Sequence, residues 1–166
     1  MKKTQENLMA AFAGESQANR KYLAFAEKAE KEGYPNVARI YRAIAEAETV
    51  HALKHLEVAG KIGNTADNLE ASVEGEEYEF TVMYPEFIDA AREEDQSRAL
   101  KSFEFANEAE KVHGGIFSEM LSKVKEGQDQ SVADVSLCPV CGWVGLDDIP
   151  ERCPICNTPA RMFRSF

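Results

Sequence analysis

The sequence predicts a mainly α-helical protein, in which a four-helix bundle is followed by a small metal-binding module built on four cysteines. Apolar residues recur at helical spacing as far as residue 126, and the first half of that region resembles the second half. All four cysteines fall in the last 29 residues, as two Cys-x-x-Cys pairs. A chain of 166 residues, 44% of them hydrophobic, has room for one ordinary domain with a sizeable core and for one small module.

The first helical hairpin is predicted from apolar spacing and from its turn residues. Apolar positions at helical spacing cover 4–32, and Gly33 then supplies a glycine stop. Pro35 suits the first turn of the next helix, which we expect over 35–59, ending at Gly60.

The second hairpin is predicted over 66–94 and 96–126. Pro85 lies inside the first of these helices and should kink it or cost stability, because proline lacks the backbone N–H. The segment 95–97 (Asp-Gln-Ser) can cap the last helix, which ends at Gly127.

The two hairpins resemble each other. Residues 14–33 match 75–94 loosely, and 45–51 match 107–113, with a glycine before a lone glutamate in both halves. Two copies are too few for a solenoid, so a duplicated hairpin forming one bundle is the better interpretation. The predicted domains are a helical domain over 1–127, a polar linker over 128–136 and the cysteine module over 137–166.

A Glu-x-x-His motif occurs once in each half, and each copy follows a lone glutamate by 33 or 34 residues. Residues three apart share a helix face, so the glutamate and histidine of each motif project together. Two such sets from paired helices are what a two-metal site in a helical bundle requires, and carboxylates with imidazoles suit iron or manganese. The candidate ligands, which are also the candidate catalytic residues, are Glu15, Glu48, His51, Glu76, Glu79, Glu110 and His113.

The cysteine pairs form two knuckles for one tetrahedral ion, with eleven residues between the pairs. Their spacing indicates a metal and leaves iron and zinc open, because zinc ribbons and rubredoxins share it. The neighbouring two-metal site favours iron, since redox chemistry there needs an electron source. The four ligands are Cys138, Cys141, Cys153 and Cys156.

Composition excludes several classes of partner. The net charge of −10 argues against nucleic acid and anionic membranes. No apolar run is long enough to span a bilayer, and the N-terminal segment lacks the apolar stretch of a signal peptide, so we expect a cytoplasmic location. In a reducing compartment, paired cysteines indicate a metal site and not disulfides.

Together these motifs resemble the rubrerythrin family over essentially the whole chain. The segments that carry the resemblance are 11–18, 75–87, the two Glu-x-x-His motifs and the terminal Cys-Pro-Val-Cys-Gly-Trp and Cys-Pro-Ile-Cys-Asn. The resemblance implies a ferritin-like diiron bundle and a rubredoxin-like domain with one iron-tetrathiolate centre. It implies a non-haem diiron peroxidase that reduces hydrogen peroxide to water in defence against oxidative stress.

The resemblance also assigns roles within that machinery. Glu48 and Glu110 would bridge the two irons, and a redox-linked ligand exchange would involve Glu79 and His51. It implies a homodimer, or a higher homo-oligomer, in which the cysteine domain of one subunit serves the other subunit's diiron site. A reductase or rubredoxin, fed indirectly by NAD(P)H, would supply the electrons. Two small departures, Trp143 in place of the usual tyrosine and Asn157 after the last cysteine, leave the ligand set intact.

The residues leave several alternatives open. A ferroxidase or iron-handling ferritin-like protein with a structural zinc ribbon would favour oxygen over peroxide as oxidant. A helical binding protein with a structural zinc would be colourless, and an oxygen-activating hydroxylase would need a substrate pocket. The sequence also leaves open the metal in each site, the physiological electron donor, and the exchange of helices between subunits.

Overall fold

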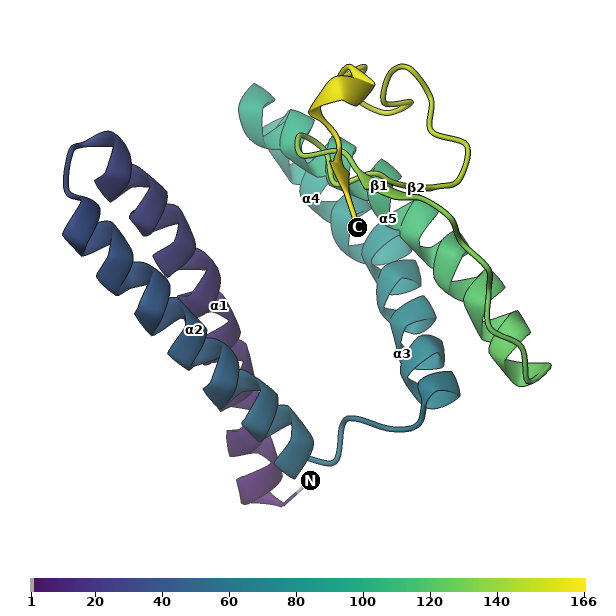
Figure 1. Ribbon diagram of the computed structural model, residues 1–166, viewed down its shortest axis with the longest axis horizontal. Coiled ribbons are helices and arrows are strands. Elements are labelled where there is room, and N and C mark those ends of the chain that lie inside the picture. Colours follow the sequence, from purple (N-terminus) through teal and green to yellow (C-terminus); the bar gives the residue numbers. More distant parts are fainter. Residues whose placement is uncertain (1) are drawn as a thin grey trace. The chain divides into compact units, whose positions relative to one another are not determined.

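The computed structural model describes residues 2–166, and these form two compact units, one ending at Gly63 and the other running from Asn64 to Phe166 (Figure 1). The first unit is an antiparallel pair of helices, α1 (Lys3–Lys31) and α2 (Pro35–Val58). The second unit contains α3 (Thr65–Tyr78), the π-helix η1 (Glu79–Met83), α4 (Tyr84–Glu93), α5 (Ser97–Lys125), β1 (Val135–Leu137), β2 (Val144–Leu146), the 3₁₀-helix η2 (Ala160–Met162) and β3 (Arg164–Ser165).

The first unit is held together by small side chains. Ala26, Ala29 and Ala38 are buried between α1 and α2, where their size lets the two backbones approach closely. The side-chain amide of Asn19 crosses the pair and donates to the carbonyl oxygen of Ala45 at 2.7 Å. Apolar packing and a few polar contacts across the pair therefore keep the hairpin in register.

The same turn closes both helical hairpins. Gly33 adopts φ +84°, and the amide of the next residue donates to the Ala29 carbonyl at 2.9 Å. Asp95 adopts φ +54° in the corresponding place, and the next amide donates to Ala91 at 2.9 Å. The predicted capping of the last helix by residues 95–97 is wrong, since α5 begins without a side-chain capping bond and Asp95 serves the turn instead.

The predicted third helix over 66–94 is interrupted. Directly before Pro85 the chain widens into the π-helix η1, in which the Tyr84 amide donates to the Glu79 carbonyl. Proline has no N–H for the carbonyl four residues earlier, so a widened turn accommodates it without a sharp break. The expected disturbance at Pro85 is therefore present, in the form of a π-helical turn.

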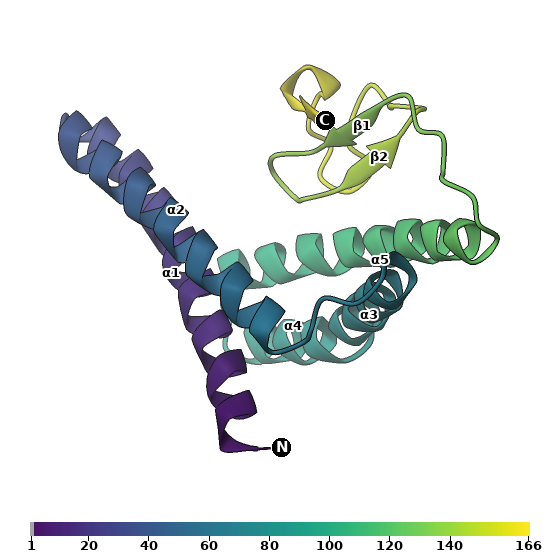
Figure 2. The ribbon, with the colours of Figure 1, turned by 60° about the horizontal axis from the view of Figure 1, so that its bottom comes forward.

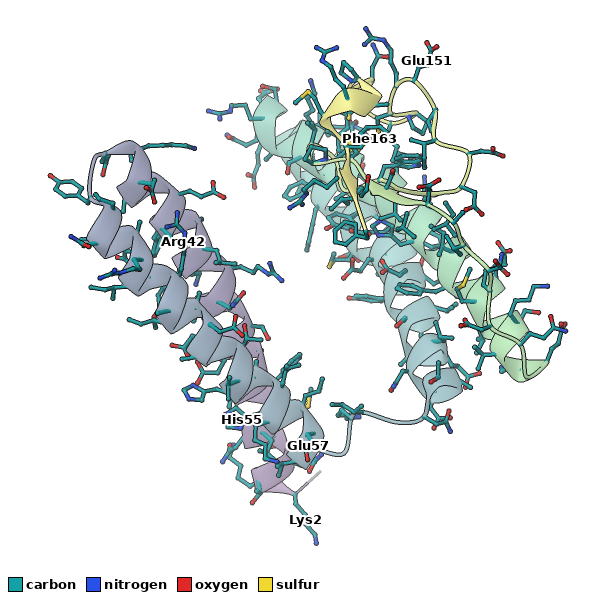
Figure 3. The ribbon with its side chains drawn as sticks, viewed as in Figure 1. Lys2, Arg42, His55, Glu57, Glu151 and Phe163 are labelled. Atoms are coloured by element: carbon teal, nitrogen blue, oxygen red, sulfur yellow. The ribbon has the colours of Figure 1, made fainter. Side chains whose placement is uncertain are left out.

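The second unit ends in a small three-stranded antiparallel sheet of order β2-β1-β3. Ser136 pairs with Gly145 on one side and with Ser165 on the other. Trp143 is 7% exposed and packs on Phe163 with ring centroids 5.6 Å apart; Phe163 is labelled in Figure 3. After α5 the chain turns back, so that β1 and β2 lie over the helix that they follow (Figure 2).

Charged residues cover the outer surfaces of the helices. Arg42 donates to Glu30 at 2.9 Å between α2 and α1, and Arg92 donates to Glu104 at 3.0 Å between α4 and α5. Such exposed pairs contribute about 0.2–1 kcal/mol each. Within the described part of the chain, no helix combines the length and the apolar character needed to cross a membrane.

Candidate metal centres

The first carboxylate–histidine group lies between α1 and α2. Glu15 comes from α1, whereas Glu48 and His51 come from successive turns of α2. Each of the three offers a ligand atom within 4.8 Å of the others. His51 Nδ1 lies 3.1 Å from Glu48 Oε2, and the His51 side chain is 57% exposed in this unit. We call these three residues the first half-site.

The second half-site has the same composition. Glu76 from α3 and the pair Glu110 and His113 from α5 offer ligand atoms within 4.8 Å of one another. His113 Nδ1 lies 2.6 Å from Glu110 Oε2, and both side chains are about four-fifths buried. The structure therefore brings six of the seven sequence-predicted bundle ligands together as two separate groups of three.

The seventh candidate ligand, Glu79, lies outside these groups. The sequence places it one turn after Glu76 on a continuous helix, whereas the structure places it at the start of η1. Burial, followed by repulsion from the Glu110 carboxylate, raises the pKa of Glu79, so its carboxyl group is within electrostatic reach of the second half-site.

The second half-site concentrates negative charge. Burial and then the nearby Glu110 carboxylate raise the pKa of Glu76 to about 7, although His113 acts in the opposite direction. A carboxyl group with such a pKa is half neutral near physiological pH. A bound cation would instead stabilise the carboxylate, and this is the environment that a metal site provides.

Tyr84 is a site residue that is not among the candidate residues predicted from the sequence. Burial first, and then the carboxylates Glu110, Glu79 and Glu76, raise the pKa of its phenol. Its hydroxyl group therefore lies in the field of the second half-site and stays protonated as a hydrogen-bond donor. In the sequence, the signal that could have indicated this role is the position of Tyr84 five residues after the candidate ligand Glu79.

The four cysteines meet in the C-terminal module. Cys138 Sγ lies 3.5 Å from Cys156 Sγ, and Cys141 Sγ lies 3.4 Å from Cys153 Sγ, and all four thiols are free. These four sulfur atoms converge as tetrahedral thiolate coordination requires.

Hydrogen bonds lower the pKa of Cys156, the most exposed of these four thiols. Burial acts to raise the pKa of Cys156, but hydrogen bonds from Thr158 and from neighbouring cysteines outweigh it and lower the pKa to about 7. Burial raises the pKa of both Cys141 and Cys153. A metal ion would offset that burial by binding the thiolates directly.

The cysteine module contacts the second half-site of its own chain. His113 Nε2 lies 2.9 Å from the carbonyl oxygen of Gly142, the residue after Cys141. Phe105 and Val112 of α5 pack against the buried cysteine cluster. A carbonyl oxygen can only accept, so Nε2 donates its proton to Gly142. This hydrogen bond orients the ring and leaves Nδ1 on the side of Glu110, where a metal ion could bind it.

A cavity of about 260 Å³ opens beside this contact. Its walls are the apolar side chains of Ile116, Phe117 and Val144, together with Glu76 and His113. A small polar molecule that enters this cavity would pass apolar side chains and reach Glu76 and His113, two of the candidate ligands.

Known protein families match both parts of the chain. The rubrerythrin family model matches residues 6–121, and the model described as "Rubrerythrin, rubredoxin-like domain" matches residues 137–164. The carboxylate–histidine groups and the four-cysteine cluster are accordingly suited to a diiron site and to one iron-tetrathiolate site.

Curated relatives are similar over almost the whole chain. Rubrerythrin-2 of Clostridium acetobutylicum is 37% identical, covering 98% of this chain and 96% of its own length. Nigerythrin of Nitratidesulfovibrio vulgaris is 36% identical, covering 98% of this chain and 86% of its own. Rubrerythrin of the same organism is 35% identical over 97% and 93%.

Solved structures of nigerythrin are similar to this chain as well. Nigerythrin in a partially reduced state and in a fully reduced, all-ferrous state each match with a TM-score of 0.60 and 33% identity, covering all of this chain and 88% of nigerythrin. The predicted fold class, a ferritin-like helical region followed by a rubredoxin-like four-cysteine domain, is confirmed. By the family model, by relatives more than 30% identical and by structural similarity, this chain belongs to the rubrerythrin family.

Proposed function

We propose that this protein is a non-haem diiron peroxidase that reduces hydrogen peroxide to water in defence against oxidative stress. Hydrogen peroxide takes up two electrons and two protons and yields two molecules of water. The proposal makes the four-cysteine iron centre the source of electrons for the diiron site, and an external reductase or rubredoxin, fed indirectly by NAD(P)H, its donor.

One observation carries the proposal. The four-cysteine cluster is packed on α5 beside the second half-site, and the Gly142–His113 hydrogen bond links the two. A purely structural zinc ribbon needs no such contact with a metal ligand. A one-electron centre that serves the half-site must lie close to it, and this contact supports that role.

The proposed diiron ligands are the residues of the two half-sites together with Glu79. When bound, the iron pair supplies the electrons and the Lewis acidity that peroxide reduction requires. We also propose domain boundaries at 1–127, 128–136 and 137–166, a cytoplasmic location and a homodimer or higher homo-oligomer.

The chain's own residues position the substrate and move protons. The Tyr84 phenol, held protonated by the surrounding carboxylates, can donate a hydrogen bond to a peroxide oxygen. A carboxyl group such as Glu76, with a pKa of about 7 before metal is bound, becomes a carboxylate when a cation replaces its proton. The apolar side chains of Ile116, Phe117 and Val144 line the cavity beside Glu76 and His113.

The test is an anaerobic titration of the fully reduced, iron-loaded protein with hydrogen peroxide, followed by visible absorption. Return of the ferric-thiolate band at sub-stoichiometric peroxide, faster than with dissolved oxygen, is the expected result. A response to oxygen with little response to peroxide would contradict the proposal and favour the ferroxidase alternative. A colourless zinc-holding module would contradict the electron-transfer part.

A further inference from the structure

Asn107, on α5, carries a buried acceptor atom without a partner. The residue is 9% exposed. Among the buried side-chain nitrogen and oxygen atoms of residues 2–166, its Oδ1 is the one that has no hydrogen-bond partner. Such an acceptor has lost its bonds to water and gained none in return, so it destabilises the fold. A rule of folding that is broken in this way indicates a place where a ligand supplies the missing donor.

The position of Asn107 along α5 places it beside the second half-site. It follows Phe103 by four residues and precedes Glu110 by three, and these spacings put the three side chains in one row on the helix. Phe103 packs on Tyr84, with ring centroids 6.4 Å apart. Burial and then the Glu110 carboxylate raise the pKa of the Tyr84 phenol. Tyr84 therefore borders both neighbours of Asn107 in this row.

The same row continues to Gly114, which shows what it faces. Gly114 follows Glu110 by four residues, and it is buried. A Cβ atom there would lie 3.4 Å from the Phe80 ring and 3.5 Å from the Cβ atom of Glu76. The row thus faces α3 and η1, the segments that carry the lone glutamate and the π-turn. Asn107 is enclosed on this inner face, between aromatic rings and carboxylates.

The first hairpin shows that packing alone does not require an asparagine here. The residue 62 positions earlier is Ala45, which is 1% exposed. The first hairpin does contain an amide, but its protons are used: Asn19 Nδ2 donates to the Ala45 carbonyl at 2.7 Å and to Thr49 Oγ1 at 2.9 Å. Asn19 therefore has a structural role, whereas the Oδ1 atom of Asn107 forms no bond that would hold the fold together.

The two polar groups beside the half-site have complementary requirements. The Tyr84 phenol, which stays protonated, can donate a hydrogen bond, whereas Asn107 Oδ1 can only accept one. A molecule that satisfies both groups must accept and donate at once. Hydrogen peroxide has lone pairs and two O–H groups, so it meets both requirements. Dioxygen has no proton, and in its presence Oδ1 stays unpaired.

We propose that Asn107 is a specificity-determining residue, which accepts a hydrogen bond from hydrogen peroxide in the second half-site and thereby favours peroxide over dioxygen. This inference rests on the proposed function and deepens it, because it names the group that selects the oxidant. A site built to bond an O–H group discriminates against a molecule that lacks one, since its buried acceptor is then left unpaired. The step is binding alone, in which no covalent bond breaks and no electron moves.

The first experiment compares Asn107→Val with Asn107→Thr in the full-length protein. The two side chains have nearly the same shape and are both branched at Cβ, but threonine keeps an oxygen atom that can accept. Each iron-loaded, fully reduced variant is mixed with hydrogen peroxide and, separately, with dioxygen.

The ratio of the peroxide rate to the dioxygen rate should fall about tenfold in Asn107→Val, the size of effect that one hydrogen bond produces. The dioxygen rate itself should stay near wild type. Asn107→Thr should lie between the two, about threefold above valine, because its oxygen is closer to the backbone than Oδ1. An equal fall in both rates, or the same ratio in the threonine and valine variants, would overturn the inference.

A second readout measures binding without turnover. The zinc-loaded, redox-silent protein is titrated with hydrogen peroxide while ¹⁵N–¹H spectra follow the side-chain amide of Asn107 and the backbone amide of Glu110. Both signals should shift and saturate, and removal of the peroxide by catalase should restore them. In Asn107→Val, half-saturation at Glu110 should need about tenfold more peroxide. Failure of wild type to show a saturable, reversible shift, or equal half-saturation in both proteins, would contradict the assignment.

A third readout separates this role from a structural one. Leucine is close to asparagine in shape and has no unpaired acceptor, so Asn107→Leu should increase the folding equilibrium constant of the zinc-loaded protein by about tenfold in denaturant unfolding at fixed free zinc. A residue that held the fold through a hydrogen bond would give the opposite result. Lower stability in Asn107→Leu would therefore overturn the inference.

These readouts also separate the inference from the proposed function. If the reduced, iron-loaded wild type does not react with peroxide, the peroxidase proposal fails, and the titration of the zinc-loaded protein alone decides whether Asn107 binds peroxide. If wild type reacts but Asn107→Val keeps the wild-type ratio of rates, the peroxidase proposal stands and the role of Asn107 is refuted.

Discussion

Glu79 and Tyr84 are joined by a π-type hydrogen bond, in which the Tyr84 amide donates to the Glu79 carbonyl five residues earlier. The π-helical turn contains one residue more than the equivalent part of the first hairpin. Before it, Glu15 and Glu76 are 61 positions apart; after it, Tyr22 and Tyr84 are 62 positions apart. The unequal gaps of 33 and 34 residues between lone glutamates and motifs are thus explained.

After η1, equivalent residues of the two hairpins stay 62 positions apart. The ion pair of Glu30 with Arg42 recurs as Arg92 with Glu104, with its two charges exchanged. An extra residue in the middle of a helix normally rotates everything after it by about 100°. A π-turn confines that rotation to a few residues, so the later contacts of the hairpin survive.

Deleting Val82 should therefore keep the fold while changing the metal site. Val82 is 40% exposed within η1, and its removal restores the spacing of the first hairpin. We expect little change in helical circular dichroism, but iron content below that of wild type, because the widened turn that presents Glu79 is lost. Val82→Ala keeps the chain length and should keep full iron content. Unchanged iron binding in the deletion variant would show that η1 does not serve the ligand set.

The metal-free protein should lose stability as pH rises. The pKa of Glu76 is raised from an ordinary value of 4.5 to about 7, chiefly by burial. The folded state thus binds more protons than the unfolded state, and the stability contributed by neutral Glu76 is present below pH 4.5 and lost through pH 7. Glu76→Gln should flatten this dependence in denaturant unfolding measured across that range. Glu77→Gln, at the exposed neighbouring position, is the control, and an equal flattening there would contradict the assignment to Glu76.

Thr158 should raise the reduction potential of the four-cysteine iron. Its hydroxyl lies 3.1 Å from Cys156 Sγ, and hydrogen bonds to sulfur stabilise the more negative ferrous state. Thr158→Val should therefore lower the midpoint potential by about 60 mV, equivalent to a tenfold change in a one-electron equilibrium. Thr158→Ser retains the hydroxyl and should stay near wild type. Redox titration followed by visible absorption measures both, and an unchanged potential in the valine variant would refute this role.

Gly145→Ala should destabilise the cysteine module. A Cβ atom at Gly145, in the middle of β2, would collide with the indole ring of the buried Trp143. Overpacking of this kind costs about 1–3 kcal/mol, and a clash with a rigid ring belongs at the upper end. The expected result is faster loss of the ferric-thiolate band in denaturant.

The double variant Gly145→Ala with Trp143→Leu tests the cause. It should recover part of the lost stability, because leucine leaves the space that the indole occupies. If the single variant is as stable as wild type, or if the double variant recovers nothing, the collision is not the cause.

Local patterns predicted most of the ligands. Glu48 and His51 are three residues apart, as are Cys138 and Cys141, and at such short range backbone geometry alone brings side chains together. The turn after Gly33 was also predictable, because glycine accepts φ +84° without steric cost. The equivalent turn at Asp95 was not predicted, because an acidic residue just before a helix is typical of an N-terminal cap.

By itself, the sequence determined the helical hairpins, the spacing of the metal motifs and the family, since each depends on residues close together along the chain. Only the tertiary structure decided the π-turn at Glu79 and the position of Tyr84 in the field of the carboxylates. It alone also placed Gly142 against His113, residues that are 29 positions apart. Contacts at that separation depend on how whole elements pack and on which partner satisfies a buried polar group, and no local spacing encodes that choice.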